Sequence, residues 1–202
     1  DAIFIPVGGG GLLAGVAAYV KHLHPKTRII GVEVEGSNCM DAALRAGKRV
    51  KLPLETLDLF ADGVSVAQAG LLPFKIARKY VDEIVVVNID EICAAIKDVF
   101  EDTRGVSEPA GALAIAGMKR YLADHPGLSS VVAIVSGANV NFDRLRHISE
   151  RAEVGEAREA VLAVTIDEAQ GSFLKFCRAL GKRSITEFNY RYAKGSQAEI
   201  FV

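Results

Sequence analysis

The sequence predicts an α/β fold in which helices cover a parallel sheet, followed by a smaller α+β unit. Short apolar runs rich in β-branched residues alternate with amphipathic helical patterns, as in parallel sheets that are buried on both faces. A glycine-rich loop joins the first apolar run to the first helical pattern. After Phe142 the order of the patterns changes, and 202 residues are enough for one large domain plus part of another.

The first part of the chain is expected to contain four strands. Residues 3–7 form an apolar run with β-branched side chains, and the spacing of Leu12, Val16 and Val20 after the glycines predicts a helix. Asp90 can cap a later helix, because its side chain can accept hydrogen bonds from the first turn. The remaining strands are expected at 28–34, 83–87 and 130–135, and the remaining helices at 38–46, 90–101 and 109–122.

The second part begins with a segment at 143–159 that is dense in Arg and Glu and suits an exposed linker or a connecting helix. The elements expected after it are a strand at 160–166, a helix at 171–180, a strand at 184–192 and the start of a strand at 198–202. That order begins a βαββαβ regulatory unit, which the sequence does not complete. We therefore expect one domain segment at 1–150, a linker at 151–159 and an incomplete unit at 160–202.

The composition argues against several classes of protein. Lys plus Arg (24) nearly balance Asp plus Glu (25), so the chain lacks the basic surface that a nucleic-acid partner requires. Cys39, Cys93 and Cys177 are far apart and have no adjacent His, which suits a reducing cytoplasm better than a disulfide framework or a zinc site. No apolar run approaches the roughly 18 residues of a membrane span. The chain begins without Met, and we interpret it as a fragment that lacks an N-terminal part.

Four successive glycines, Gly8, Gly9, Gly10 and Gly11, stand between the first strand and the first helix. Backbone N–H groups and the positive end of the helix converge there, and no Cβ atom obstructs an approaching anion. A tight turn without a ligand is the alternative, but four glycines lose more conformational entropy than such a turn requires. The pattern therefore favours a phosphate-binding loop.

Two other phosphate-binding motifs fit this loop less well. Glycines at 9, 11 and 15, with Glu33 and Glu35 at the end of the next strand, imitate a dinucleotide fingerprint, but the third glycine falls one residue late. No Gly-Lys-Ser/Thr sequence follows, which excludes a nucleoside-triphosphate P-loop at this position.

Two further polar segments lie at the ends of expected elements. Residues 107–112 (SEPAGA) open a helix and residues 136–139 (SGAN) follow a strand, where α/β proteins form binding sites. Each segment also has a purely structural interpretation, with Ser107 as an N-cap, Glu108 as an acid in the first turn and Ser136 as a turn former.

Taken in order, GGGGL, ADGV, EPAGA and SGANV resemble the motifs of fold-type II pyridoxal-phosphate (PLP) enzymes, the tryptophan-synthase β-subunit-like group. The runs at 108–121, 136–156, 160–166 and 171–177 are similar to biosynthetic threonine dehydratase in particular. The tail from Ala160 resembles the ACT-like regulatory region of that family, which catabolic dehydratases and serine racemase lack. The resemblance covers essentially the whole chain. It implies a three-layer PLP fold, partial in this chain, and the start of the regulatory domain.

The resemblance assigns eight residues to cofactor binding. Ser136 matches the serine that faces the pyridine nitrogen, where a neutral hydroxyl cannot hold a proton on the nitrogen as a carboxylate would. Gly63 matches a glycine beside the cofactor ring, and Glu108 lies in an acidic motif near the pyridine edge. The residues that match the loop around the PLP phosphate are Gly8, Gly9, Gly10, Gly11 and the amide of Leu12.

The chain contains no match to the catalytic lysine of the family. That Schiff-base lysine belongs to a Ser-Phe-Lys segment upstream of the glycine loop, whereas Lys75 follows the loop, on what we interpret as the polar face of an amphipathic helix with Lys79. Glu33 matches a position that helps bind a divalent cation in serine racemase, but its neighbours depart from that pattern, so we predict no metal site. We interpret Glu33 and Glu35 as exposed glutamates at a strand end.

For the intact enzyme, the resemblance implies PLP-dependent dehydration and deamination of L-threonine to 2-oxobutanoate and ammonia in isoleucine biosynthesis. Isoleucine would inhibit through the regulatory region and valine would oppose it, in a cytoplasmic homotetramer without membrane partners. The alternatives are a serine/threonine dehydratase, a serine racemase, or a non-catalytic fragment that binds phosphate or an amino acid. Without the lysine, we expect this fragment alone to be inactive.

Overall fold

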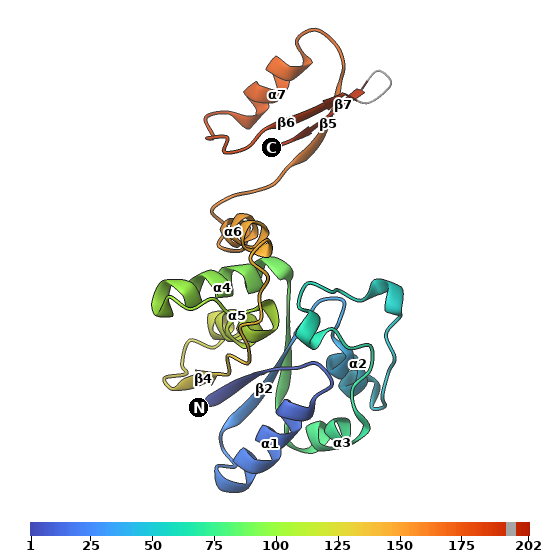
Figure 1. Cartoon of the computed structure of the whole chain (residues 1–202), viewed down its shortest axis with the longest axis vertical. Helices are drawn as coiled ribbons and strands as arrows, with labels where there is room; N and C mark the ends of the chain where they lie inside the picture. The colour runs from blue at the N-terminus through green and yellow to red at the C-terminus, as the bar shows by residue number, and fades with distance from the viewer. Residues whose placement is uncertain (193–196) are drawn as a thin grey trace. The chain divides into compact units, whose positions relative to one another are not determined.

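Four parallel strands form the larger sheet, in the order β3–β2–β1–β4 (Figure 1). The strands are β1 (Ala2–Pro6), β2 (Arg28–Val34), β3 (Glu83–Val87) and β4 (Val131–Ala133). The computed structural model describes residues 1–192 and 197–202 of the chain. Contacts within the chain define two units, Asp1–Glu156 and Ala157–Val202, and the boundary between them falls inside the segment 151–159 where the sequence predicts a linker.

Helices cover both faces of this sheet because successive side chains of each strand point to opposite faces. Phe4 and Val32 belong to the core that α4 (Ile89–Thr103) and α5 (Pro109–Asp124) complete. Ile5 and Val7 belong to a second core. The helices that complete this second core are α1 (Gly11–Leu23), α2 (Cys39–Ala46) and α3 (Leu71–Tyr80). The predicted α/β architecture with three layers is therefore confirmed.

Most predicted elements are found within a few residues of their expected bounds, and two differ in instructive ways. Asp90 does not cap α4, because Asn88 does so in a capping box with Glu91. Asp90 lies in the first turn and forms an ion pair with Arg151 at 2.6 Å. The strand expected at 184–192 is reduced to β6 (Asn189–Tyr192).

Glu33 is buried in the structure, so its interpretation as an exposed glutamate was wrong. Its side chain is 0% exposed, and its two carboxylate oxygens accept hydrogen bonds from the N–H groups of Met40 (2.8 Å) and Asp41 (2.7 Å). These contacts cap the N-terminus of α2, where the side chain of Asn38 makes no capping bond. Glu35 is exposed, as predicted. Within the described residues no group of three or more His, Cys, Asp or Glu side chains could hold a metal ion.

The charged segment after Phe142 forms a connecting helix, α6 (Arg144–Gly155). It is only partly exposed, because Ile148 and Ala152 are buried in the same core as α4 and α5. Lys97 on α4 forms ion pairs with Glu153 (2.7 Å) and Glu156 (2.8 Å), which hold the two helices together along their polar edge.

The second unit contains a small antiparallel sheet in the order β5–β7–β6 and one helix. β5 (Ala163–Asp167) and β7 (Gln197–Phe201) pair along five residues, and α7 (Ser172–Leu180) lies between β5 and β6 in the chain. Phe176, Ala198 and Ile200 form the buried apolar positions. No helix within residues 1–192 and 197–202 is long and apolar enough to span a membrane.

The packing of α5 on β2 gives a direct test of the fold. A Cβ atom on Gly117 would lie 2.4 Å from Cγ2 of Val32, so Gly117→Ala should push the helix away from the sheet and lower the free energy of unfolding by about 1–3 kcal/mol. Urea unfolding followed by circular dichroism measures this loss. The matched control is Gly127→Ala, because a Cβ there would meet nothing within 4 Å. Equal unfolding midpoints for the two variants would contradict the packing.

Candidate cofactor site

The strand order identifies the carboxyl ends of β1 and β4 as the candidate site. The chain runs from β1 to β2 and β3, and then returns to β4 on the other side of β1 (Figure 1). Phe4 pairs with Ala133, so the segments that follow these two parallel strands leave the sheet side by side. In open α/β sheets, ligands bind outside the carboxyl ends where the strand order reverses. The glycine loop follows β1 at this point, and Ser136 follows β4.

Two of the four glycines pack the loop against the protein. A Cβ atom on Gly8 would lie 3.1 Å from Cα of Val64, and a Cβ on Gly10 would lie 2.4 Å from Cε of Met40. Gly10 also has a φ of 88°, a left-handed conformation that favours glycine. A side chain at Gly8 would crowd the backbone of Val64, and one at Gly10 would be strained by the left-handed backbone conformation.

The other two glycines leave the N-terminus of α1 open. A Cβ on Gly9 or Gly11 would meet no atom of the described residues within 4 Å, and Leu12 is 45% exposed. Helix α1 begins at Gly11, and no described side chain caps it. Because the first four N–H groups of a helix have no partner within the helix, this end offers N–H donors and the positive end of the helix dipole to an anion.

Gly63 links the glycine loop to the N-terminus of α5. It lies in a 3₁₀ turn, η2 (Asp62–Val64), whose Val64 contacts Gly8. A Cβ on Gly63 would lie 3.0 Å from Cβ of Ala110, so a larger residue would crowd the start of α5. Gly63 itself is exposed, and a ligand can therefore approach its backbone.

The segment that contains Ser136 packs on the same end of α5. The Oγ of Ser107 donates a hydrogen bond to the carbonyl oxygen of Gly137 (3.0 Å), and the N–H of Glu108 donates to the same oxygen (3.2 Å). A Cβ on Gly111 would lie 2.2 Å from that oxygen, which explains the glycine in the EPAGA motif. Ser107 therefore anchors the turn after β4, a role that its N-cap interpretation missed.

Ser136 and Glu108 lie next to the hydrogen bonds that the carbonyl oxygen of Gly137 accepts. The Oγ of Ser136 is 3.4 Å from the carbonyl oxygen of Ala110, a long contact that leaves the hydroxyl proton able to turn to another acceptor. The carboxylate of Glu108 fills the space beside Gly137, where a Cβ would lie 1.8 Å from Oε1. The glycine loop contacts the turn that contains Gly63, this turn contacts the start of α5, and α5 contacts Ser136. The segments that contain the eight predicted residues therefore lie together at one edge of the sheet.

Sequence reasoning missed the residues that lie behind the loop. The thiol of Cys39 donates to the carbonyl oxygen of Gly8 (3.7 Å), and the N–H of Gly70 donates to that of Gly9 (2.9 Å). Burial, with a smaller contribution from the charge of Glu33, raises the pKa of the Cys39 thiol to about 12, so the thiol remains protonated and can donate. Lys75 is exposed on α3, and the amphipathic helix predicted around it is confirmed.

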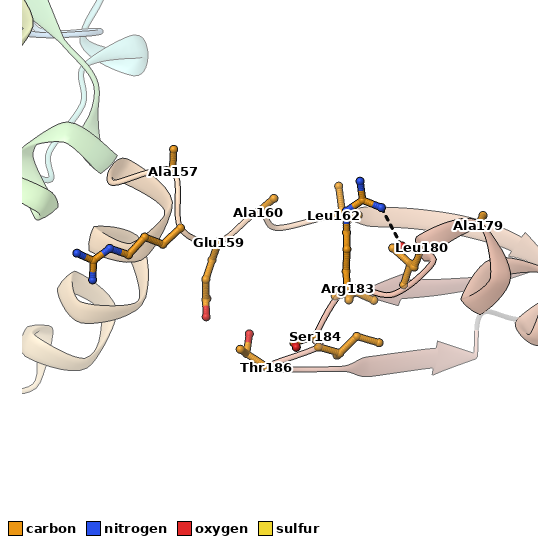
Figure 2. Close-up of a pocket in the computed structure, with 12 residues that line it drawn as sticks. Ala157, Glu159, Ala160, Leu162, Ala179, Leu180, Arg183, Ser184 and Thr186 are labelled. Carbon is orange, nitrogen blue, oxygen red and sulfur yellow. Dashed lines mark hydrogen bonds between the residues drawn. The ribbon is translucent and has the colours of Figure 1, made fainter.

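A second candidate site is a cavity of about 790 Å³ within the second unit (Figure 2). Figure 2 shows Glu159 on the segment before β5, and Ser184 and Thr186 on the segment after α7. The guanidinium of Arg183 donates to the carbonyl oxygen of Leu180 (2.8 Å), which fixes its position at the wall. The apolar part of the lining includes Leu162, Leu180, Ile185 and Val202, and Arg158 is a second basic residue in the lining.

Comparison with known proteins identifies relatives for both units. Residues 1–137 match the family model described as pyridoxal-phosphate dependent enzyme, and residues 150–202 match the C-terminal regulatory domain of threonine dehydratase. The biosynthetic L-threonine dehydratase of Escherichia coli is 57% identical over 203 residues, which cover 100% of this chain and 39% of that protein. The chain therefore spans about two fifths of the length of this relative.

Solved structures show the same similarity. Threonine deaminase isoform 2 from Solanum lycopersicum superposes with a TM-score of 0.72 at 47% identity, over 75% of this chain and 44% of that one. Serine racemase from Dictyostelium discoideum superposes with a TM-score of 0.63 at 34% identity, over 70% of this chain and 45% of that one. With the site geometry and the first family model in agreement, the chain belongs to the pyridoxal-phosphate-dependent enzyme family, and residues 150–202 match the C-terminal regulatory domain of threonine dehydratase.

Proposed function

We propose that the protein to which this chain belongs dehydrates and deaminates L-threonine to 2-oxobutanoate and ammonia, with PLP bound at the edge of β1 and β4. The observation that carries the proposal is the convergence of the open glycine loop, Gly63 and Ser136 at the point where the strand order reverses. The identity of 57% to an L-threonine dehydratase supports the choice of substrate. We assign residues 1–150 to the catalytic domain, 151–159 to a linker and 160–202 to part of the regulatory domain.

The glycine loop would bind the phosphate of the cofactor. Its residues fit that group because the N-terminus of α1 is uncapped among the described residues and the space in front of Gly9 and Gly11 is open. PLP, when bound, supplies an electron sink that stabilises negative charge on the α-carbon of an amino acid. Leu12 would contribute its backbone N–H, since it lies in the first turn of α1, where N–H groups have no partner within the helix.

Ser136 would face the pyridine nitrogen, and Glu108 and Gly63 would lie beside the ring. The hydroxyl of Ser136 is held only by a 3.4 Å contact, so it can donate to a nitrogen acceptor instead. A neutral hydroxyl leaves that nitrogen unprotonated, which weakens the electron sink and favours elimination over transamination. Ser136, in the segment that follows β4, would thus determine whether the pyridine nitrogen is protonated.

The second unit would make the enzyme responsive to amino acids, with isoleucine as inhibitor and valine as its antagonist. The cavity combines an aliphatic lining with Arg183 and Glu159, which suit the carboxylate and the ammonium group of an amino acid. Differential binding of such a ligand to two states of the enzyme is the requirement for feedback control. A homotetramer and a cytoplasmic location complete the proposal, although a yeast relative at 49% identity is named mitochondrial.

The serine racemase alternative has the lower sequence identity to this chain. The structure of the Dictyostelium enzyme is 34% identical over the 70% of this chain that it covers, whereas the threonine dehydratase of Escherichia coli is 57% identical over 100% of this chain. The match of residues 150–202 to the regulatory domain of threonine dehydratase is the specific observation that favours the biosynthetic enzyme.

Ser136→Ala in the full-length protein should lower kcat by about 10-fold or more while PLP remains bound, because the phosphate contacts are untouched. Steady-state release of 2-oxobutanoate and the cofactor content per subunit are the two measurements. Ser130→Ala, an exposed serine before the same strand, serves as the control and should leave both unchanged. Loss of bound PLP in proportion to activity would show that Ser136 holds the cofactor in place instead.

Arg183→Gln should raise the isoleucine concentration for half-maximal inhibition by about 10-fold or more and leave the uninhibited rate unchanged, because it removes the charge that pairs with the effector carboxylate. Inhibition curves at fixed threonine concentration give both quantities. The neighbouring Lys182→Gln removes the same charge outside the cavity lining, so it should behave like the unsubstituted enzyme. Equal sensitivity of the two variants to isoleucine would move the effector site elsewhere.

A further inference from the structure

Glu33 is a buried carboxylate that cofactor binding does not use directly. It stands on β2, one residue before the strand ends, and its side chain is fully buried. Both oxygens are engaged, one by the N–H of Met40 (2.8 Å) and the other by the N–H of Asp41 (2.7 Å). When a carboxylate on a strand accepts hydrogen bonds from the first turn of a helix with both of its oxygens, it fixes the position of that helix relative to the sheet.

The first turn of α2, which Glu33 fixes, forms the wall behind the glycine loop. The thiol of Cys39 donates to the carbonyl oxygen of Gly8, and the methyl group of Met40 lies 2.4 Å from the place a Cβ on Gly10 would occupy. Cys39 and Met40 are both 0% exposed, so neither can move without disturbing the core. The contacts therefore join Glu33 to the loop through two consecutive residues.

A loop of four glycines has no side chains of its own to hold its shape. Its backbone must be supported from outside if its N–H groups are to point at one phosphate, and a displacement of about 0.5 Å is enough to spoil such a geometry. The support seen here comes from η2, from the start of α3 and from the first turn of α2. Only the third of these is held by a buried carboxylate.

We propose that Glu33 is a positioning residue for the phosphate of the cofactor, acting through the N-terminus of α2 on Gly8 and Gly10. The inference rests on the proposed role of the glycine loop. It assigns this strand-end glutamate a role in the shape of an anion-binding loop. Removal of the cap is expected to weaken binding of a phosphate-bearing ligand more than it weakens binding of the same ring without phosphate.

The test compares PLP with phosphate-free pyridoxal, titrated by visible absorbance into the full-length protein with Glu33→Gln. We expect the dissociation constant for PLP to rise by about 10-fold or more, and that for pyridoxal to change by less than about twofold. The control is Glu91→Gln, which makes the same change in the capping box of α4, remote from the loop. A purely structural role predicts that both variants lower the melting temperature without changing the preference for PLP.

The outcomes separate this inference from the proposed function. If the unsubstituted protein binds PLP no more tightly than pyridoxal, the assignment of the glycine loop to phosphate binding is wrong, and so is the inference about Glu33. If the unsubstituted protein prefers PLP and Glu33→Gln keeps that preference, the positioning role alone is wrong. Should Glu33→Gln fail to fold, Cys39→Ala removes only the thiol that contacts Gly8, and it should reduce the preference about threefold. An unchanged preference in Cys39→Ala would also overturn the inference.

Discussion

Close backbone contact at glycines, at the carboxyl ends of β1 and β4, is the constraint on which this site depends. Gly8 lies against Val64, and Gly63 of the same turn lies against Ala110 at the start of α5. On the other side of α5, Gly111 lets the carbonyl oxygen of Gly137 approach. Each contact brings two segments from distant parts of the chain within van der Waals distance, and none tolerates a Cβ without displacement. The site therefore depends on glycine at these positions as much as on the side chains that surround them.

Buried polar groups complement these contacts and give the glycine segments a defined shape. Ser107 and the N–H of Glu108 both donate to the oxygen of Gly137, and Glu33 holds the turn of α2 that supports the glycine loop. Burial raises the pKa of Glu33, whereas the N–H groups of Met40 and Asp41 lower it, so the charged form that accepts both hydrogen bonds depends on these two partners. The two arrangements do not share residues.

Periodic patterns in the sequence were sufficient to predict the layers, because strands buried on both faces and amphipathic helices have distinct signatures. The places of the glycine loop, between a strand and a helix, and of Ser136, after a strand, could also be predicted from the apolar patterns that flank them. The cap by Glu33 could not be predicted, because it joins β2 to α2 through a tertiary contact that no local sequence pattern indicates. Residues 184–188 were predicted as part of a strand because they include the apolar Phe188. The ring of Phe188 instead packs edge-to-face against Phe173 of α7, with ring centroids 5.3 Å apart, which is a tertiary contact.

The central claim, that backbone N–H groups at the open glycines bind the phosphate of PLP, is tested most directly by Gly9→Val in the full-length protein. The new side chain would meet no protein atom near its Cβ and would occupy the space in front of α1. We expect an unchanged melting temperature of the cofactor-free protein and a PLP dissociation constant raised by about 100-fold or more, with Gly127→Val unchanged in both respects. A stable Gly9→Val protein that binds PLP as tightly as the unsubstituted one would contradict it.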